Sequence, residues 1–122
     1  MAKKILTVDD SKTMREMVSR TLQGAGFEVC ETVDGQDALR ALEGNPKYDL
    51  IITDLNMPFM DGFGLIEALR ANPAYKYVPI LVLTTEADTA KKERGKAAGA
   101  TGWIVKPFSP EKLVQVVNKV CA

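Results

Sequence analysis

The chain contains no histidine and only two cysteines, Cys30 and Cys121. Two cysteines are too few for the disulfide framework of a small secreted domain, and without histidine they have no partner to complete a zinc site. We therefore expect both thiols to be packing residues rather than metal ligands or nucleophiles.

The chain also lacks a net charge, a long apolar run and a visible secretory signal. Its sixteen lysines and arginines balance sixteen aspartates and glutamates, so no overall field attracts nucleic acid or an anionic membrane. No apolar run approaches the roughly 20 residues that a membrane helix needs. The N-terminal sequence Met1-Ala2-Lys3-Lys4 leads directly into a short strand-like run. These absences predict a cytoplasmic protein that binds neither nucleic acid nor membrane.

The length of 122 residues is close to the commonest size of one domain. A composition of 46% hydrophobic and 26% charged residues is ordinary for a soluble globular protein. The sequence contains no linker, internal repeat or low-complexity segment. Residues 1–122 are therefore expected to form a single domain, with no effector domain after Ala122.

Strand-like apolar runs alternate with segments of helical periodicity along the chain. The predicted strands cover residues 4–8, 27–31, 50–53, 79–83 and 102–105. The predicted helices cover residues 11–24, a short segment around 38–42, 62 to about 72, 88–98, and the chain from about 110 onward. This alternation predicts a doubly wound α/β fold, with a five-stranded parallel sheet, helices on both faces and right-handed crossovers. The run 79–83 is the most continuous apolar strand and is expected in the middle of the sheet.

Polar residues stand where four of the predicted strands end. Asp9 and Asp10 follow the first strand, Asp54 the third, Thr84 the fourth and Lys106 the fifth. Each of them alone has an ordinary explanation as a helix cap, a turn residue or a surface lysine. Because the carboxyl ends of parallel strands share one edge of the sheet, we expect all five to converge there, where open α/β sheets bind their ligands.

The chemistry of this set points to phosphoryl transfer. Three carboxylates in a partly dry crevice repel one another, and without a cation at least one of them tends to stay protonated. Mg²⁺ removes the conflict, because it prefers oxygen ligands and usually takes one or two carboxylates together with phosphate oxygens. One carboxylate then remains free to attack phosphorus and become an aspartyl phosphate. Lys106 would neutralise the phosphoryl oxygens, and Thr84 could donate its hydroxyl to one of them.

Four segments carry these residues, and their order and spacing resemble the signatures of the response-regulator receiver family, most closely its stand-alone, CheY-type members. The segments are Val8-Asp9-Asp10-Ser11, Asp54-Leu55-Asn56-Met57-Pro58-Phe59-Met60-Asp61-Gly62, Leu83-Thr84-Thr85-Glu86-Ala87 and Gly102-Trp103-Ile104-Val105-Lys106-Pro107-Phe108. The resemblance covers the whole chain. It implies a flavodoxin-like (βα)5 fold with strand order 2-1-3-4-5, and a cis peptide bond between Lys106 and Pro107.

The resemblance also implies roles for the residues around the phosphorylation site. It makes Asp54 the phosphoacceptor, modified to 4-aspartylphosphate, and places Asp54, Asp9, Asp10 and the backbone carbonyl of Asn56 around Mg²⁺. The side chains of Asn56 and Glu86 stand at the family positions that tune the lifetime of the phosphoryl group.

A second group of residues is implied to respond to phosphorylation. Thr84 and Lys106 would move toward the phosphoryl group, and Trp103 stands at the position of an aromatic residue that moves inward with the threonine. This aromatic is commonly tyrosine or phenylalanine, so the larger indole bears on how easily it swings. Gly95 costs its helix about 1 kcal/mol against alanine and is expected to leave it comparatively labile. The basic residues of that helix are expected to form a solvated face beside the output surface: Lys91, Lys92, Arg94 and Lys96.

On this resemblance the chain is a monomeric switch rather than an enzyme, promoting only its own phosphorylation and dephosphorylation. The implied partners are a CheA-like histidine kinase, a downstream protein such as a flagellar motor switch protein, and a phosphatase. The output surface would comprise the fourth helix, the fifth strand and the fifth helix. A motor regulator in chemotaxis, a phosphate sink and a phosphorelay intermediate all remain open.

Two other classes share part of the pattern. A flavodoxin-like FMN carrier has the same architecture but would want neutral phosphate donors in the first loop, where Asp9 and Asp10 would repel the phosphate. A Mg²⁺-dependent aspartyl phosphatase also uses a carboxylate nucleophile. Such enzymes typically place a general acid two residues after the nucleophile, and the residue there is Asn56, which cannot transfer a proton.

Overall fold

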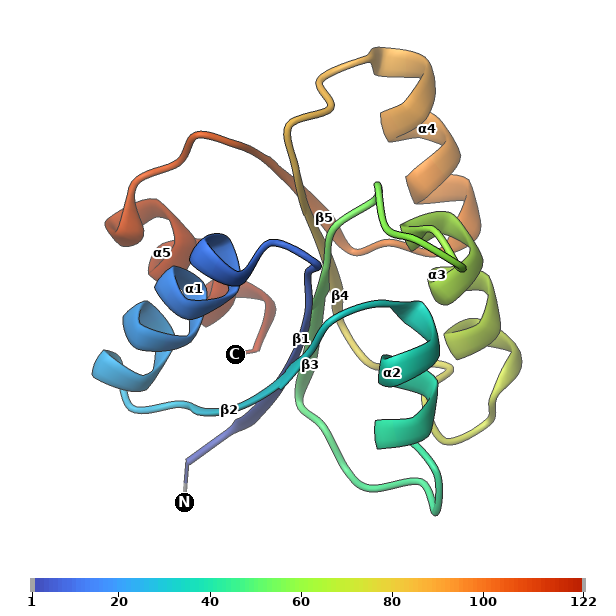
Figure 1. The fold of residues 1–122 in the computed structure, drawn as a ribbon, viewed down its shortest axis with the longest axis horizontal. Helices are drawn as coiled ribbons and strands as arrows, with labels where there is room; N and C mark the ends of the chain where they lie inside the picture. Colours follow the sequence, from blue (N-terminus) through green and yellow to red (C-terminus); the bar gives the residue numbers. More distant parts are fainter. Residues whose placement is uncertain (1, 122) are drawn as a thin grey trace.

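Strands and helices alternate throughout residues 2–121, the part of the chain that this computed structural model describes (Figure 1). The strands are β1 (Lys4–Val8), β2 (Glu28–Thr32), β3 (Leu50–Thr53), β4 (Ile80–Thr84) and β5 (Gly102–Val105). The helices are α1 (Lys12–Gly24), α2 (Gly35–Ala41), α3 (Gly62–Ala71), α4 (Thr89–Ala98) and α5 (Pro110–Val120). The predicted order of elements is confirmed, and the bounds of β2 and β4 differ from the prediction by one residue.

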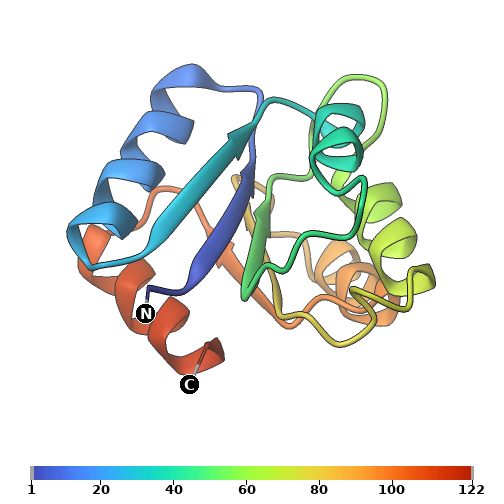
Figure 2. The same cartoon turned by 90° about the horizontal axis from the view of Figure 1, so that it is seen from below.

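The strands form one parallel sheet in the order β2-β1-β3-β4-β5, as the resemblance implied. Helices α1 and α5 cover one face of the sheet, and α2, α3 and α4 cover the other (Figures 1 and 2). The prediction that the run 79–83 lies in the middle was wrong by one place, because β3 is the central strand. β4 is nevertheless buried along its whole length, since it has a strand on either side.

The core has two halves because successive residues of a strand face opposite sides of the sheet. Leu6 and Val8 of β1 pack in the half that also holds Phe63 of α3, whereas Ile5 packs with Leu22 of α1 in the other half. Cys30 and Cys121 are free thiols that pack against one half each, as expected from their number. No helix within residues 2–121 is both long enough and apolar enough to cross a bilayer.

Each helix begins at a polar side chain that accepts a hydrogen bond from an amide of its first turn. These capping residues are Ser11, Asp34, Asp61, Asp88 and Ser109. Within residues 2–121, each of the five capped helices follows the carboxyl end of the strand before it after a loop. The caps therefore determine where those loops lie, and with them the polar edge of the sheet.

Candidate functional site

Three carboxylates meet at the carboxyl edge of the sheet. Asp9, Asp10 and Asp54 each offer an oxygen, and these oxygens lie within 4.8 Å of one another. The residues come from neighbouring strands, since Val8 of β1 stands opposite Thr53 of β3. The structure thus brings together the three acidic residues that the sequence placed at strand ends.

Backbone hydrogen bonds hold two of these residues firmly. The amide of Asp54 donates to the carbonyl of Val8 at 3.0 Å, and the amide of Asp9 donates to the carbonyl of Thr32 at 3.1 Å. Both residues are thereby fixed one step beyond their strands. The amide of Leu55 donates to Asp54 Oδ1 at 2.7 Å, which orients the carboxylate as well.

The loop after Asp54 passes close to it because residue 62 is glycine. A Cβ at Gly62 would lie 2.9 Å from the Cα of Leu55 and would also strike the carbonyl oxygen of Asp54. The Gly62 amide donates to the Leu55 carbonyl at 2.9 Å. A side chain here would push the loop away from the site, so this glycine is needed for close approach rather than for chain flexibility.

Lys106 provides a cation inside the cluster. Its Nζ lies 3.1 Å from Asp9 Oδ2 and 3.4 Å from Asp54 Oδ2, and its side chain is 10% exposed. The Lys106 amide donates to the carbonyl of Thr84 at 2.7 Å, and the bond to Pro107 is cis, as the resemblance implied. The lysine relieves part of the repulsion between carboxylates before any metal ion binds.

Burial raises the pKa of Asp9 above its ordinary value. The Ser11 amide, which donates to Asp9 Oδ1 at 2.9 Å, and the Lys106 ammonium both act in the opposite direction. The negative charge of Asp54 adds only a small upward contribution. The main cause of the raised pKa is loss of solvent rather than the repulsion between carboxylates that was expected, and a protonated carboxyl in this cluster stays a prediction.

The donor set suits a hard divalent cation. The three side chains of the cluster offer carboxylate oxygens as metal ligands, and Asp10 is exposed, so an ion could keep several water ligands while binding here. These are the features that Mg²⁺ prefers. The expected contribution of the Asn56 backbone carbonyl stays a prediction, with Asn56 itself exposed in the loop after β3.

Thr84 ends β4 at the same edge but does not contact the carboxylates. Its side chain is fully buried, and its Oγ1 accepts a hydrogen bond of 3.3 Å from the Glu86 amide. The hydroxyl can donate its own hydrogen while Oγ1 accepts from the amide, but this geometry alone does not place it at a phosphoryl oxygen. Its role as a phosphoryl contact and switch residue therefore stays a prediction.

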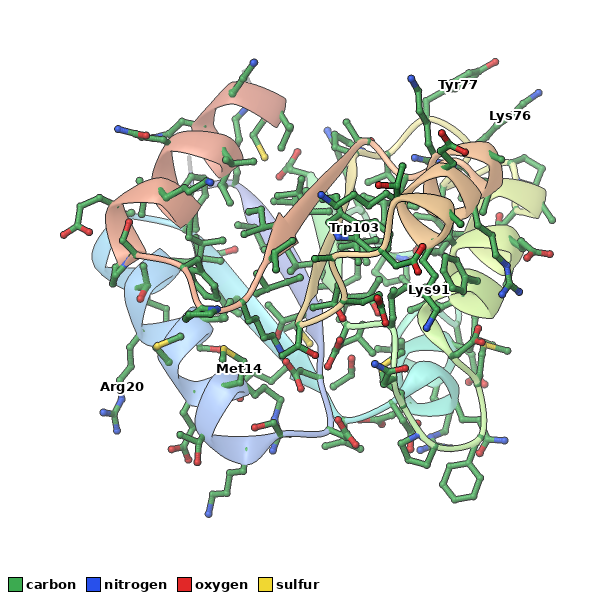
Figure 3. The ribbon with its side chains drawn as sticks, turned by 90° about the horizontal axis from the view of Figure 1, so that it is seen from above. Met14, Arg20, Lys76, Tyr77, Lys91 and Trp103 are labelled. Atoms are coloured by element: carbon green, nitrogen blue, oxygen red, sulfur yellow. The ribbon has the colours of Figure 1, made fainter. Side chains whose placement is uncertain are left out.

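Glu86 links Trp103 to the start of α4. The indole Nε1 of Trp103 donates to the Glu86 carbonyl at 3.0 Å, and the Glu86 carboxylate lies 3.0 Å from Lys91 Nζ. This ion pair lowers the pKa of Glu86, and the Asp88 amide adds to the effect. Figure 3 shows Trp103 beside α4 and Lys91 extending from that helix. The loop after β4 is thus tied to β5 and α4 at once.

The four basic residues of α4 are exposed, as expected, and two of them also contact other side chains. Lys91 pairs with Glu86, and the guanidinium of Arg94 lies 4.2 Å from the centre of the Phe63 ring. Lys92 and Lys96 are exposed beside an open cavity of about 250 Å³ that Trp103 also lines.

Sequence reasoning missed the purpose of Gly95. The residue is buried, and a Cβ on it would lie 2.7 Å from Cζ3 of the Trp103 indole. The interpretation as a weak point of the helix was incomplete, because the glycine makes room for the ring. A glycine inside a helical pattern was the available signal, since such a residue can mark close packing.

Comparisons with known proteins identify one family. The family model described as response regulator receiver domain matches residues 5–118. The chemotaxis protein CheY1 of Helicobacter pylori is 40% identical over 118 residues, which cover 96% of this chain and 95% of the relative. The chemotaxis protein CheY of Pseudomonas aeruginosa is 38% identical, with coverage of 96% and 94%.

Solved structures agree with the fold over nearly the whole chain. The chemotaxis response regulator CheY4 of Vibrio cholerae superposes with a TM-score of 0.92 at 51% identity, covering 98% of this chain and 99% of that one. The receiver domain of a sensor histidine kinase from Pseudomonas aeruginosa superposes with a TM-score of 0.90 at 28% identity, covering 99% and 98%. That structure is described as having a magnesium ion coordinated in the active site cleft.

Proposed function

The chain belongs to the response regulator receiver family and is a CheY-like protein of two-component signalling, and we propose that Asp54 accepts a phosphoryl group from the phosphohistidine of a partner kinase. One observation carries the proposal. The Asp54 carboxylate lies beside two other carboxylates and within 3.4 Å of the Lys106 ammonium, at the carboxyl edge of the sheet.

The proposed reaction is a single displacement at phosphorus. An oxygen of Asp54 forms the new O–P bond while the P–N bond to the kinase imidazole breaks, and the electron pair leaves with the imidazole. The Leu55 amide holds the Asp54 carboxylate in place, and Lys106 is positioned to neutralise phosphoryl oxygens. Later attack by water on the acyl phosphate returns Asp54 to its starting state. In this role the protein is a phosphoacceptor switch.

The proposed cofactor is Mg²⁺, held by Asp9, Asp10 and Asp54 with the Asn56 backbone carbonyl. A divalent ion there would offset the charge of the incoming phosphoryl group, which three carboxylates would otherwise repel. The oxygen-only donor set of this chain and the magnesium ion in the cleft of the Pseudomonas receiver domain both support this choice.

The proposed output is a change in the surface formed by α4, β5 and α5. A phosphoryl group on Asp54 would draw Thr84 and Lys106 toward it, and Thr84 would give up its bond to the Glu86 amide. Since the Glu86 carbonyl also binds Trp103, a shift of this loop would alter how the indole is held. Two arrangements of the loop would then differ in their affinity for a partner. We propose that Asn56 and Glu86 influence how long the phosphoryl group survives.

The proposed setting is chemotaxis, because the relatives from Helicobacter and Pseudomonas are named as chemotaxis proteins. A CheA-like kinase would then be the phosphoryl donor, a flagellar motor switch protein the target, and a phosphatase a third partner. We further propose that the chain acts as a cytoplasmic monomer and folds as one receiver domain. A phosphate sink or relay intermediate would use the same site but would not bind a motor component.

Two rival functions fit the site less well. An FMN phosphate would meet the carboxylates of Asp9 and Asp10, and a purified protein without yellow absorbance would argue against a bound flavin. An aspartyl phosphatase needs a general acid two residues beyond Asp54, where Asn56 stands. Turnover of p-nitrophenyl phosphate would favour that enzyme class.

The test uses acetyl phosphate with and without Mg²⁺. We expect intact-mass spectrometry to show one added phosphoryl group only when both are present, together with a change in the emission of Trp103. Asp54→Asn should remove the added mass and the phosphate-dependent change in emission. Glu16→Gln, an exposed carboxylate on α1, is the matched control and should behave as the wild type. Unchanged phosphorylation of the Asp54→Asn protein would refute the proposal.

A further inference from the structure

Arg15 lies at the floor of the site but takes no part in the proposed reaction. Its Nη1 donates to the backbone carbonyl of Asp9 at 2.7 Å, and its Nε lies 3.4 Å from Oε1 of Glu31. The side chain is only 15% exposed. With Asp9 and Asp54 it lines a cavity of about 10 Å³ beneath the carboxylates, room for roughly one water molecule.

The location of this arginine is unfavourable for the helix that carries it. Arg15 is the fourth residue of α1, near the positive end of the helix dipole, where cations are destabilising. Burying most of a guanidinium adds a further cost unless its donors are satisfied. The Asp9 carbonyl accepts from Nη1 and the Glu31 carboxylate pairs with the charge, and these contacts offset part of both costs.

These contacts complete the hold on Asp9. The Asp9 amide donates to the carbonyl of Thr32, and the Asp9 carbonyl accepts from Arg15. The two carboxylate oxygens accept from the Ser11 amide and the Lys106 ammonium. The chain turns from β1 into α1 at this point. The orientation of the peptide unit after Asp9 therefore decides where the carboxylates of Asp9 and Asp10 point.

Lys106 and Arg15, the two cations near Asp9, contact different groups of the site. Lys106 contacts the carboxylates of Asp9 and Asp54 directly. The guanidinium of Arg15 instead contacts a neutral carbonyl, and its charge is paired with Glu31 on β2.

We propose that Arg15 is a positioning residue for the phosphorylation site: anchored by Glu31, it fixes the Asp9 carbonyl and so presents the carboxylates of Asp9 and Asp10 to a divalent cation. This inference rests on the proposed function, because it concerns the metal that phosphorylation of Asp54 would need. Partners that orient metal ligands from behind typically contribute about 10- to 100-fold to metal affinity.

The test measures Mg²⁺ binding by calorimetry in the absence of any phosphoryl donor. Arg15→Met, which keeps the apolar stem, should weaken Mg²⁺ binding about tenfold. Arg15→Lys, which keeps the charge and one donor, should lose less. The control is Arg20→Met on the same helix, because Arg20 points into solvent (Figure 3) and should leave the affinity unchanged. Thermal melting verifies that each variant is folded at the temperature of the titration.

Glu31→Gln tests the anchor and serves if Arg15→Met does not fold. It should weaken Mg²⁺ binding, and Arg15→Met combined with Glu31→Gln should be no weaker than Arg15→Met alone, since the glutamate acts through the arginine. At limiting Mg²⁺ these variants should be phosphorylated by acetyl phosphate more slowly than the wild type. At saturating Mg²⁺ their rate should recover.

Two results would overturn the inference and leave the proposed function standing. They are Mg²⁺ affinity of Arg15→Met within twofold of the wild type, or losses that simply add in the double variant. A wild-type protein that binds no Mg²⁺ or takes up no phosphoryl group would instead refute the proposed function itself.

Discussion

The indole of Trp103 lies where a side chain at residue 95 would have to be. A Cβ on Gly95 would come 2.7 Å from Cζ3 and 3.2 Å from Cε3 of the ring, and the indole Nε1 donates to Glu86 on the loop before α4. The glycine and the tryptophan therefore form a matched pair. The position of the indole is coupled to the packing of α4 against β5.

Gly95→Ala should displace the indole of Trp103. Alanine in a helix is favoured over glycine by about 1 kcal/mol, but overpacking a close contact costs about 1–3 kcal/mol. We expect a net loss of about 1 kcal/mol in the free energy of unfolding, measured with urea, and a shift of Trp103 emission to longer wavelength. Gly24→Ala on α1, where a Cβ would meet nothing within 4 Å, is the control. A more stable Gly95→Ala protein with unchanged emission would show that the ring needs no such room.

Lys91→Met should raise the pKa of Glu86 toward its ordinary value. A carboxyl with a lowered pKa stabilises the fold at pH values above its unfolded pKa, and this stabilisation is lost as the pH falls through the folded pKa. The variant should therefore lose less stability than the wild type on acidification through that range. Carboxyl NMR titration gives the pKa directly. Lys92→Met makes the same change in net charge and should leave Glu86 unaffected; equal pKa values of Glu86 in the wild type and Lys91→Met would contradict the role of the ion pair.

Asp9→Asn should raise the melting temperature in Mg²⁺-free buffer at neutral pH. Burial raises the pKa of Asp9, so the fold favours the protonated form of this carboxyl more than the unfolded chain does. The stabilisation of the folded state by protonated Asp9 is present at low pH and is lost as the pH rises through the raised pKa. At pH 7 the ionised carboxylate destabilises the protein, and the amide removes that cost.

Mg²⁺ should reverse the order of these two proteins. The wild type should gain melting temperature as Mg²⁺ is added, because the ion binds the folded state, whereas Asp9→Asn should gain little. Glu16→Gln is the control for loss of one negative charge outside the cluster. Equal gains in all three proteins would mean that the ion binds elsewhere.

Arg70→Met should destabilise the protein by at least about 2 kcal/mol, since a hydrogen bond to a charged group contributes about 1.5–3 kcal/mol. The Arg70 guanidinium donates to the carbonyls of Gly99 at the end of α4 and of Tyr75, Lys76 and Val78 in the loop before β4. Burial lowers the pKa of Arg70, and the guanidinium is hydrogen-bonded to these carbonyls in the fold. Urea unfolding measures the loss, with Arg20→Met as the exposed control. A loss below about 0.5 kcal/mol, the usual range for surface changes, would show that the carbonyls are well solvated without the arginine.

Much of the fold can be predicted from the order of apolar and polar residues along the sequence. Alternating apolar runs and helical periodicities specify the elements, because a strand buried on both faces and an amphipathic helix need different spacings. Parallel strands separated by helices must also end at one edge, so the sequence alone is enough to place Asp9, Asp54 and Lys106 together. The middle place of β3 was not predicted from apolar runs, since β4 is equally buried without being central.

Contacts between side chains distant in the chain are decided only by packing in three dimensions. Nothing in the local sequence shows that Arg15 turns toward the Asp9 carbonyl and Glu31, or that burial rather than repulsion raises the pKa of Asp9. The close contact between Trp103 and Gly95 likewise depends on how α4 approaches β5. Local spacing is a property of neighbours along the chain, whereas loss of solvent and close contact arise only when separate elements meet.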